Sequence, residues 1–115
     1  MAKSFAPALA AVTLLATATA VHAEVGDELR ARAPKTVATL LPWCAVNTRD
    51  CRALVGLVDL DNIAEGPSPG ACVIGTRDGE AATKSILDWL AAHKETHPNP
   101  AEAGIATAIN ALWPC

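Results

Sequence analysis

Apolar residues recur at helical spacing in several separate stretches of the chain. In the first of these, Val37, Leu40 and Leu41 are three and four residues apart and would share one face of a helix. Pro34 suits the first turn of this helix and Pro42 its end, because proline lacks the amide hydrogen that a helix interior needs. The pattern predicts a short helix between these two prolines, preceded by a frayed helical stretch.

A second stripe follows at offsets of three, four and seven residues, made of Cys51, Leu54, Val55 and Val58. Asn47 or Thr48 can cap the start of this second helix, and Asp50 lies where the helix dipole favours a negative charge. The helix should end in the segment DNIAEGPSPG, whose prolines and glycines predict a loop.

A third helix is predicted after Thr76 or Asp78, either of which can cap it. Its inner face would consist of Ala82, Ile86, Trp89 and Leu90. On its outer side, Glu80 and Lys84, and then Lys84 and Asp88, are spaced four apart and can form ion pairs.

A fourth helix is predicted after residue 99, where Asn99 can cap it, Pro100 suits the first helical position and Glu102 can complete a capping box. Its inner stripe would consist of Ala101, Ile105, Ala108, Ile109 and Leu112. Pro114 should stop this helix one residue before Cys115.

These four stripes, without an alternating pattern of useful length, predict an all-α fold, a small four-helix domain. The first 23 residues, MAKSFAPALAAVTLLATATAVHA, have a short basic start, an apolar core and small residues before a cut after Ala23. That order is typical of a cleaved secretory signal peptide, and the run is too short and too rich in alanine and threonine to favour a spanning anchor. We therefore expect a single domain over residues 24–115, in the periplasm.

Four cysteines lie beyond the predicted signal peptide: Cys44, Cys51, Cys72 and Cys115. An even number in a small exported chain predicts two disulfides, which would stabilise a domain too small to bury much surface. Three pairings are open. Helices that run alternately up and down favour Cys44 with Cys51 and Cys72 with Cys115, which would tether the end of the chain.

Charge and aromatic content narrow the expected partners. The net charge of the chain is −3, and its sequence has no stripe of basic residues. Neither nucleic acid nor an anionic membrane is therefore an expected partner. Trp43, Trp89 and Trp113 are the only aromatic residues after the predicted cut. We expect them in the core, since little else can fill it, with a role as partner anchors as the alternative.

No constellation predicts catalysis or metal binding. His93 and His97 have the spacing of two zinc ligands, but no acidic residue lies between them as HExxH requires, so we interpret them as solvated histidines near a helix end. The segment DLDNIAEG lacks the glycine and the final glutamate of a calcium loop. Ser68 and Ser85 lie in no nucleophile motif. The sequence predicts neither an enzyme nor a cofactor.

Several segments together resemble a known family. They are Cys51-x-x-Leu54-Val55-Gly56, Cys72 after a Pro/Gly-rich loop, Trp89-Leu90-x-x-His93, and Ala111-Leu112-Trp113-Pro114-Cys115. The pattern over Cys44 to Cys115 resembles the Rap/Tai-type periplasmic immunity proteins of bacterial type VI secretion systems. Leu54 stands where the family usually has an aromatic residue and Lys94 where it usually has a proline, and the segment before Cys44 has no counterpart.

The resemblance implies a small helical protein, often a homodimer, that binds and blocks a peptidoglycan-cleaving amidase effector. For the contact surface we expect the loop from Asp61 to Gly70, with Asp61, Asn62, Glu65 and Pro67, and secondly the helix exit at His93 and His97. A plain connector is the alternative for this loop. The rival functions are a periplasmic helical chaperone of acid stress, and an envelope interaction domain that shares the fold.

Overall fold

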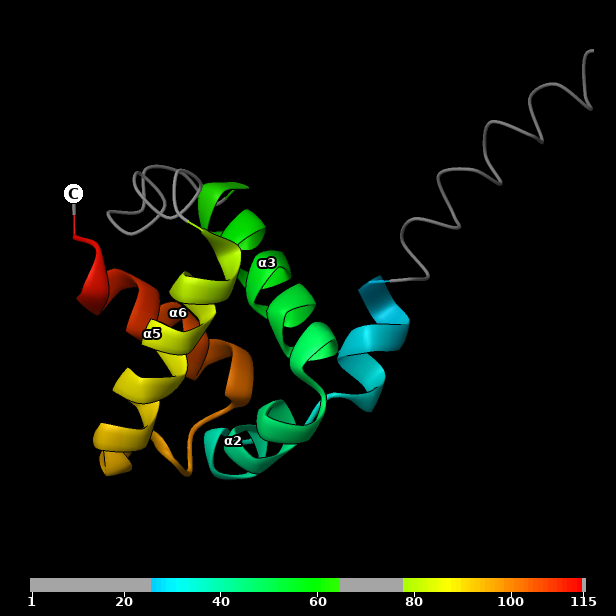
Figure 1. The fold of residues 1–115 in the computed structure, drawn as a ribbon, viewed down its shortest axis with the longest axis horizontal. Helices are drawn as coiled ribbons and strands as arrows, with labels where there is room; N and C mark the ends of the chain where they lie inside the picture. Colours follow the sequence, from blue (N-terminus) through cyan, green and yellow to red (C-terminus); the bar gives the residue numbers. More distant parts are fainter. Residues whose placement is uncertain (1–25, 65–77, 115) are drawn as a thin grey trace, which may run out of the picture. The chain divides into compact units, whose positions relative to one another are not determined.

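The structure is a computed structural model that describes residues 26–64 and 78–114. It divides into Met1–Arg32, of which residues 26–32 are helical, and Ala33–Cys115. The second unit contains α2 (Val37–Val46), α3 (Thr48–Ala64), α5 (Gly79–Ala92), the 3-10 helix η1 (Lys94–Thr96) and α6 (Ala101–Leu112) (Figure 1). The described residues contain no strand beyond one isolated antiparallel bridge between Thr36 and Pro100, which confirms the all-α class.

Several predictions concern residues outside the described part of the chain. They are the signal peptide over residues 1–23, the cap at Thr76, the loop residues Glu65, Pro67 and Gly70, and the cysteines Cys72 and Cys115. Within residues 26–64 and 78–114, no helix has the length and apolar character needed to cross a bilayer.

Helix α2 begins and ends later than its sequence predicts. Thr36 is the N-cap, and its hydroxyl accepts from the Thr39 amide at 3.3 Å while the Thr39 hydroxyl accepts from the Thr36 amide at 3.4 Å. Pro34 therefore precedes the helix. The predicted end before Pro42 is wrong, because Pro42 lies inside the helix, where it forfeits a single i to i−4 bond. Because the helix continues to Val46, Cys44 is buried on the same helix as Val37 and Leu40.

The predicted stripe of α3 is confirmed, since Cys51, Leu54, Val55 and Val58 are all buried. The side chain of Asn47 serves the preceding helix instead of α3. Its Nδ2 donates to the Trp43 carbonyl at 3.1 Å, and its backbone amide donates to the same oxygen at 2.8 Å. Asn47 thus closes the end of α2, and only its backbone carbonyl serves α3, by accepting from the Cys51 amide at 2.8 Å.

Helix α5 starts as predicted at one of its two candidate caps. The Asp78 carboxylate accepts from the Glu80 amide at 3.0 Å. The inner face is confirmed at Ala82, Ile86 and Leu90, whereas Trp89 is only half-buried.

Helix α6 lacks the predicted side-chain cap. Its N-cap is Pro100, and the described contacts include no capping bond from Asn99. Backbone groups do this work: the Ala101 amide donates to the Lys35 carbonyl at 2.9 Å, and the Val37 amide donates to the Asn99 carbonyl at 3.0 Å. The starts of α2 and α6 therefore cap each other through their backbones.

The core is aliphatic and centred on α6, which packs against α5, α3 and α2. Its largest fully buried side chains are Leu40, Leu54, Ile86, Leu90, Ile105 and Ile109. Of the three tryptophans predicted in the core, Trp113 is buried, while Trp43 and Trp89 are half-buried. Small residues explain the difference: Gly104 and Ala108 let the helices approach closely, which leaves little room for more indole rings.

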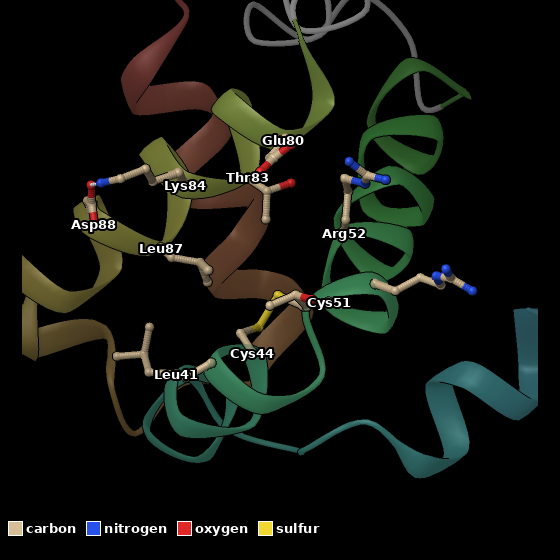
Figure 2. A pocket seen from close by; sticks show the side chains of 12 residues that line it. Leu41, Cys44, Cys51, Arg52, Glu80, Thr83, Lys84, Leu87 and Asp88 are labelled. Carbon is tan, nitrogen blue, oxygen red and sulfur yellow. Dashed lines mark hydrogen bonds and ion pairs between the residues drawn. A yellow bond between two sulfur atoms is a disulfide. The ribbon is translucent and has the colours of Figure 1, made fainter.

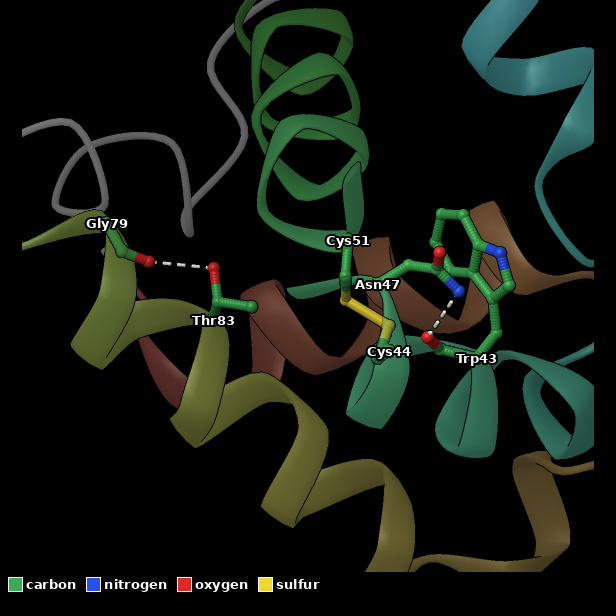
Figure 3. Close-up of a disulfide and its surroundings, with 6 residues drawn as sticks. All are labelled: Trp43, Cys44, Asn47, Cys51, Gly79 and Thr83. Atoms are coloured by element: carbon green, nitrogen blue, oxygen red, sulfur yellow. Dashed lines mark hydrogen bonds between the residues drawn. A yellow bond between two sulfur atoms is a disulfide. The ribbon is translucent and has the colours of Figure 1, made fainter. Parts of the chain in front are cut away.

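A disulfide joins the end of α2 to the start of α3. Cys44 and Cys51 are bonded, with their Cα atoms 5.1 Å apart, and both are buried (Figure 3). One of the two predicted cross-links is thereby confirmed. The other predicted pair, Cys72 with Cys115, lies outside the described residues.

Candidate functional site

The first predicted contact surface lies at the last turns of α3. Asp61 is exposed and Asn62 is half-buried, while Glu65 and Pro67 lie beyond the described end of this helix. Two buried polar atoms at this end have no hydrogen-bond partner in the described structure, Asp59 Oδ1 and Asn62 Nδ2. Burial raises the pKa of the Asp59 carboxyl. The end of α3 thus carries both the exposed side chain of Asp61 and polar atoms of Asp59 and Asn62 that are shielded from water.

The second predicted surface, at the exit of α5, differs from its prediction as two solvated histidines. His93 Nδ1 donates to the Trp89 carbonyl at 2.7 Å, and His97 Nε2 donates to the Leu90 carbonyl at 2.8 Å. Both rings are half-buried, and the His93 ring stacks on Trp89 with centroids 3.7 Å apart. The histidine side chains therefore add hydrogen bonds at the helix end to the Trp89 and Leu90 carbonyls, which also accept from the His93 backbone amide.

A metal site at these histidines would need a third ligand. In the part of the chain that the structure describes, no three histidine, cysteine or acidic side chains are grouped to hold an ion.

The two predicted surfaces are not brought together. The end of α3 faces the start of α5, whereas His93 follows the end of α5 (Figure 1). Helix α5 has 14 residues and so spans about 21 Å. Asp61 and His93 consequently belong to opposite ends of the molecule's second unit, and each is a separate candidate surface.

A groove that the sequence did not predict lies between these two ends. It has a volume of about 540 Å³ and runs between α2, α3 and α5 (Figure 2). Leu41 on α2 and Leu87 on α5 line it as half-buried apolar side chains, and the Cys44–Cys51 disulfide lines it beside them, toward α3 (Figure 2). Its size is that of sites that hold small ligands or a few side chains.

Thr83 makes the α5 side of this groove more apolar than its residue type suggests. Its hydroxyl donates to the Gly79 carbonyl of its own helix at 2.7 Å. With the hydroxyl turned toward Gly79, the methyl group points toward the disulfide (Figure 3). The groove wall therefore presents a methyl group and sulfur atoms at this point.

Charged side chains form the rim of the groove. Arg49 and Arg52 belong to α3, and neither has an ion pair or hydrogen bond within the described residues. On α5, Lys84 pairs with Asp88 at 2.7 Å, while the other predicted pair, Lys84 with Glu80, is not among the described ion pairs. The α3 rim is thus positive and unneutralised, in a chain whose net charge is −3.

A second, smaller hollow continues the groove along the seam of α3 and α5. It measures about 110 Å³ and shares Arg52 and Thr83 with the groove. Gly56 lies at its edge, and a side chain built there would meet nothing within 4 Å. The seam is open to a partner along several turns of α3.

The sequence carries a weak signal for this groove. Arg49 and Arg52 are three apart and Leu87 follows a core position, but each is ordinary for a helix surface. They form a groove only because α2, α3 and α5 pack at a distance that leaves a hollow between them, and no local sequence pattern specifies that packing.

None of the known protein-family models, curated proteins or solved structures matches this chain. The resemblance to the Rap/Tai-type immunity proteins accordingly stays a prediction.

Proposed function

We propose that this chain is a non-catalytic periplasmic immunity protein that binds a peptidoglycan amidase effector of a type VI secretion system and occludes its active site. In this proposal the signal peptide directs export and is removed after Ala23. The mature domain is a four-helix module, and a second disulfide joins Cys72 to Cys115.

The observation that supports this proposal most is the buried disulfide between α2 and α3. A protein that blocks an enzyme cleft without chemistry must hold its inserted surface in place, because every group ordered on binding costs free energy. The cross-link restrains the junction of two helices in advance, and the next residues of the same face of α3, Leu54 and Val55, are buried.

The residues on which the resemblance rests have two kinds of environment. Cys51, Leu54, Val55, Leu90 and Trp113 are buried and build the scaffold. The exposed or half-buried positions around them would then determine which partner binds.

Two surfaces made of such residues are predicted from the sequence. The first is the end of α3 with Asp61 and Asn62, and the second is the exit of α5 with His93 and His97. Since they lie at opposite ends of α5, a single cleft would engage at most one of them.

The direct test is inhibition of a cysteine–histidine peptidoglycan amidase encoded beside this chain. The oxidised, exported chain should abolish release of stem peptides from peptidoglycan at a stoichiometric amount of inhibitor. Asp61→Arg and Lys94→Glu place opposite changes at the two ends, and the variant that loses inhibition identifies the end in contact. An amidase that stays fully active with excess oxidised chain would rule out the immunity function.

Size-exclusion chromatography with light scattering on the same samples measures the stoichiometry. A homodimer of the free chain is expected. Two amidase molecules per dimer would show that the dimer contact and the inhibitory surface are separate.

A further inference from the structure

We infer that the groove between α2, α3 and α5 is a docking site for an acidic segment of a protein partner that carries adjacent large apolar side chains. This inference deepens the proposed function, on which it rests for the identity of the partner as the amidase effector. It assigns the contact to a surface that neither of the two predicted ends includes.

The apolar part of the occupant follows from the groove floor. Leu41 and Leu87 leave part of their surface open there, and the buried Thr83 and the buried disulfide form the wall beside them. Covering this surface releases water from apolar atoms, which favours leucine-sized side chains over polar ones.

The acidic part of the occupant follows from the rim. Arg49 and Arg52 have no anionic partner in the described residues, whereas Lys84 on the opposite rim is already paired with Asp88. A free guanidinium presents a fork of donors that matches a carboxylate, and arginine is enriched among the residues that carry binding energy. The positive charge of the two arginines therefore favours an occupant with carboxylates on the α3 side of the groove.

The scaffold of the groove is prepared before binding. The disulfide fixes the angle between the end of α2 and the start of α3, which carry Ala45 and Arg49 on the two sides of the groove. Both arginines stand on α3 within two turns of its start, and Figure 2 shows Arg52 on that helix facing the α5 side of the groove. Little backbone ordering then remains to be done when a partner binds.

The first experiment needs no amidase. Uniformly ¹⁵N-labelled oxidised protein is titrated with the peptide acetyl-Glu-Asp-Leu-Leu-Asp-Glu-amide and, separately, with acetyl-Lys-Lys-Leu-Leu-Lys-Lys-amide. The acidic peptide should shift the amide signals of Leu41, Ala45, Thr83 and Leu87, and the binding should weaken as salt is raised. Equal binding of both peptides, no binding of the acidic one, or shifts confined to other residues would overturn the inference.

Two variants test the groove without touching the core. Arg49→Glu combined with Arg52→Glu should weaken binding of the acidic peptide about tenfold or more, since attraction is replaced by repulsion. Ala45→Trp fills the groove from an exposed position of α2 and should have a comparable effect. Lys35→Glu is the matched control, because it reverses an exposed charge outside the groove and outside both predicted end surfaces, and should leave binding unchanged.

The same variants separate this inference from the proposed function when the amidase is used as the probe. An amidase that is inhibited equally by the wild type, the arginine double variant and Ala45→Trp would overturn the groove and leave the immunity function standing. Binding of the acidic peptide in the groove without any inhibition of the amidase would support the docking site and overturn the immunity function.

Discussion

At the scale of single residues, two glycines in helices show opposite packing requirements. A Cβ on Gly104 of α6 would overlap a methyl group of the buried Val37 and lie 3.6 Å from a methyl of Leu90. A Cβ on Gly56 of α3 would meet nothing within 4 Å. Gly104 is therefore needed for the close approach of α6 to α2, whereas Gly56 only costs helix stability.

These environments predict opposite effects of the same substitution. Gly104→Ala should lower the free energy of unfolding by about 1–3 kcal/mol, because Val37 is short, branched and fully buried and has no space to retreat. Gly56→Ala should raise it by up to about 1 kcal/mol, because alanine has the higher helix propensity and a less disordered unfolded chain. Urea denaturation of the two variants measures both.

Each variant is the control for the other, since each adds one methyl group to a helix interior. A stabilising effect of Gly104→Ala would contradict the packing of α6 against α2. Sequence alone does not distinguish the two positions, as both glycines lie within stretches of helical pattern.

At the scale of helices, the way each one starts decides how sensitive it is to its first residues. Helix α2 has a reciprocal side-chain cap between Thr36 and Thr39, with their hydroxyls 2.8 Å apart. Helix α6 starts after Pro100 without a side-chain cap in the described structure. One start depends on particular side chains, and the other on the backbone of the facing segment.

Removing the two cap side chains should therefore have unequal effects. Thr36→Ala should cost about 1 kcal/mol of stability, the usual effect of losing an N-cap. Asn99→Ala should change the stability by no more than about 0.5 kcal/mol, because its bonds are made by the backbone. Thermal unfolding followed by circular dichroism measures both, and a larger loss for Asn99→Ala would show that the side chain caps α6 after all.

The helices also show where sequence patterns are informative and where they fail. The inner stripes of α3, α5 and α6 follow from spacing, because burial on one face imposes the helical period, although Trp89 of α5 and Leu112 of α6 are only half-buried. The C-terminal end of α2 was mispredicted because Pro42 costs one hydrogen bond and Cys44 is buried beyond it, and the start was mispredicted because Thr36 and not Pro34 sets it. The cap of α6 was mispredicted because its hydrogen-bond partner, Lys35, is remote in sequence.

At the scale of the molecule, the cross-link between α2 and α3 contributes to the stability of the fold. The Cys44–Cys51 loop is short, with a sequence separation of 7. In the chain-entropy model such a loop contributes about 2.5 kcal/mol, while a loop from Cys72 to Cys115 would contribute about 4 kcal/mol.

The corresponding double variants should differ in the same order. Cys44→Ser with Cys51→Ser should lose about 2.5 kcal/mol, and Cys72→Ser with Cys115→Ser should lose about 4 kcal/mol if the proposed second bridge forms. Guanidinium denaturation of each oxidised variant measures the losses relative to the oxidised wild type. A Cys72 and Cys115 double variant as stable as the wild type would show that the second bridge is missing.

The candidate site was only partly predictable at this scale. The cysteines and the two end surfaces could be found along the chain, because each depends on neighbouring residues. The groove depends on Leu41, Arg52 and Leu87 meeting from three helices, and it exists only once those helices have packed.

The mutual backbone bonds between residues 35–38 and 97–101 make the start of α2 depend on the far end of the chain. The amides of Val37 and Ala38 are satisfied by the carbonyls of Asn99 and His97, which lie some sixty positions further along the chain. A nascent or partly translocated polypeptide that ends before those carbonyls leaves these amides to water. A chain cut short of α6 would also expose to water the faces of α2, α3 and α5 that pack on this helix, so truncation at the C-terminal end removes support from every other helix of the second unit.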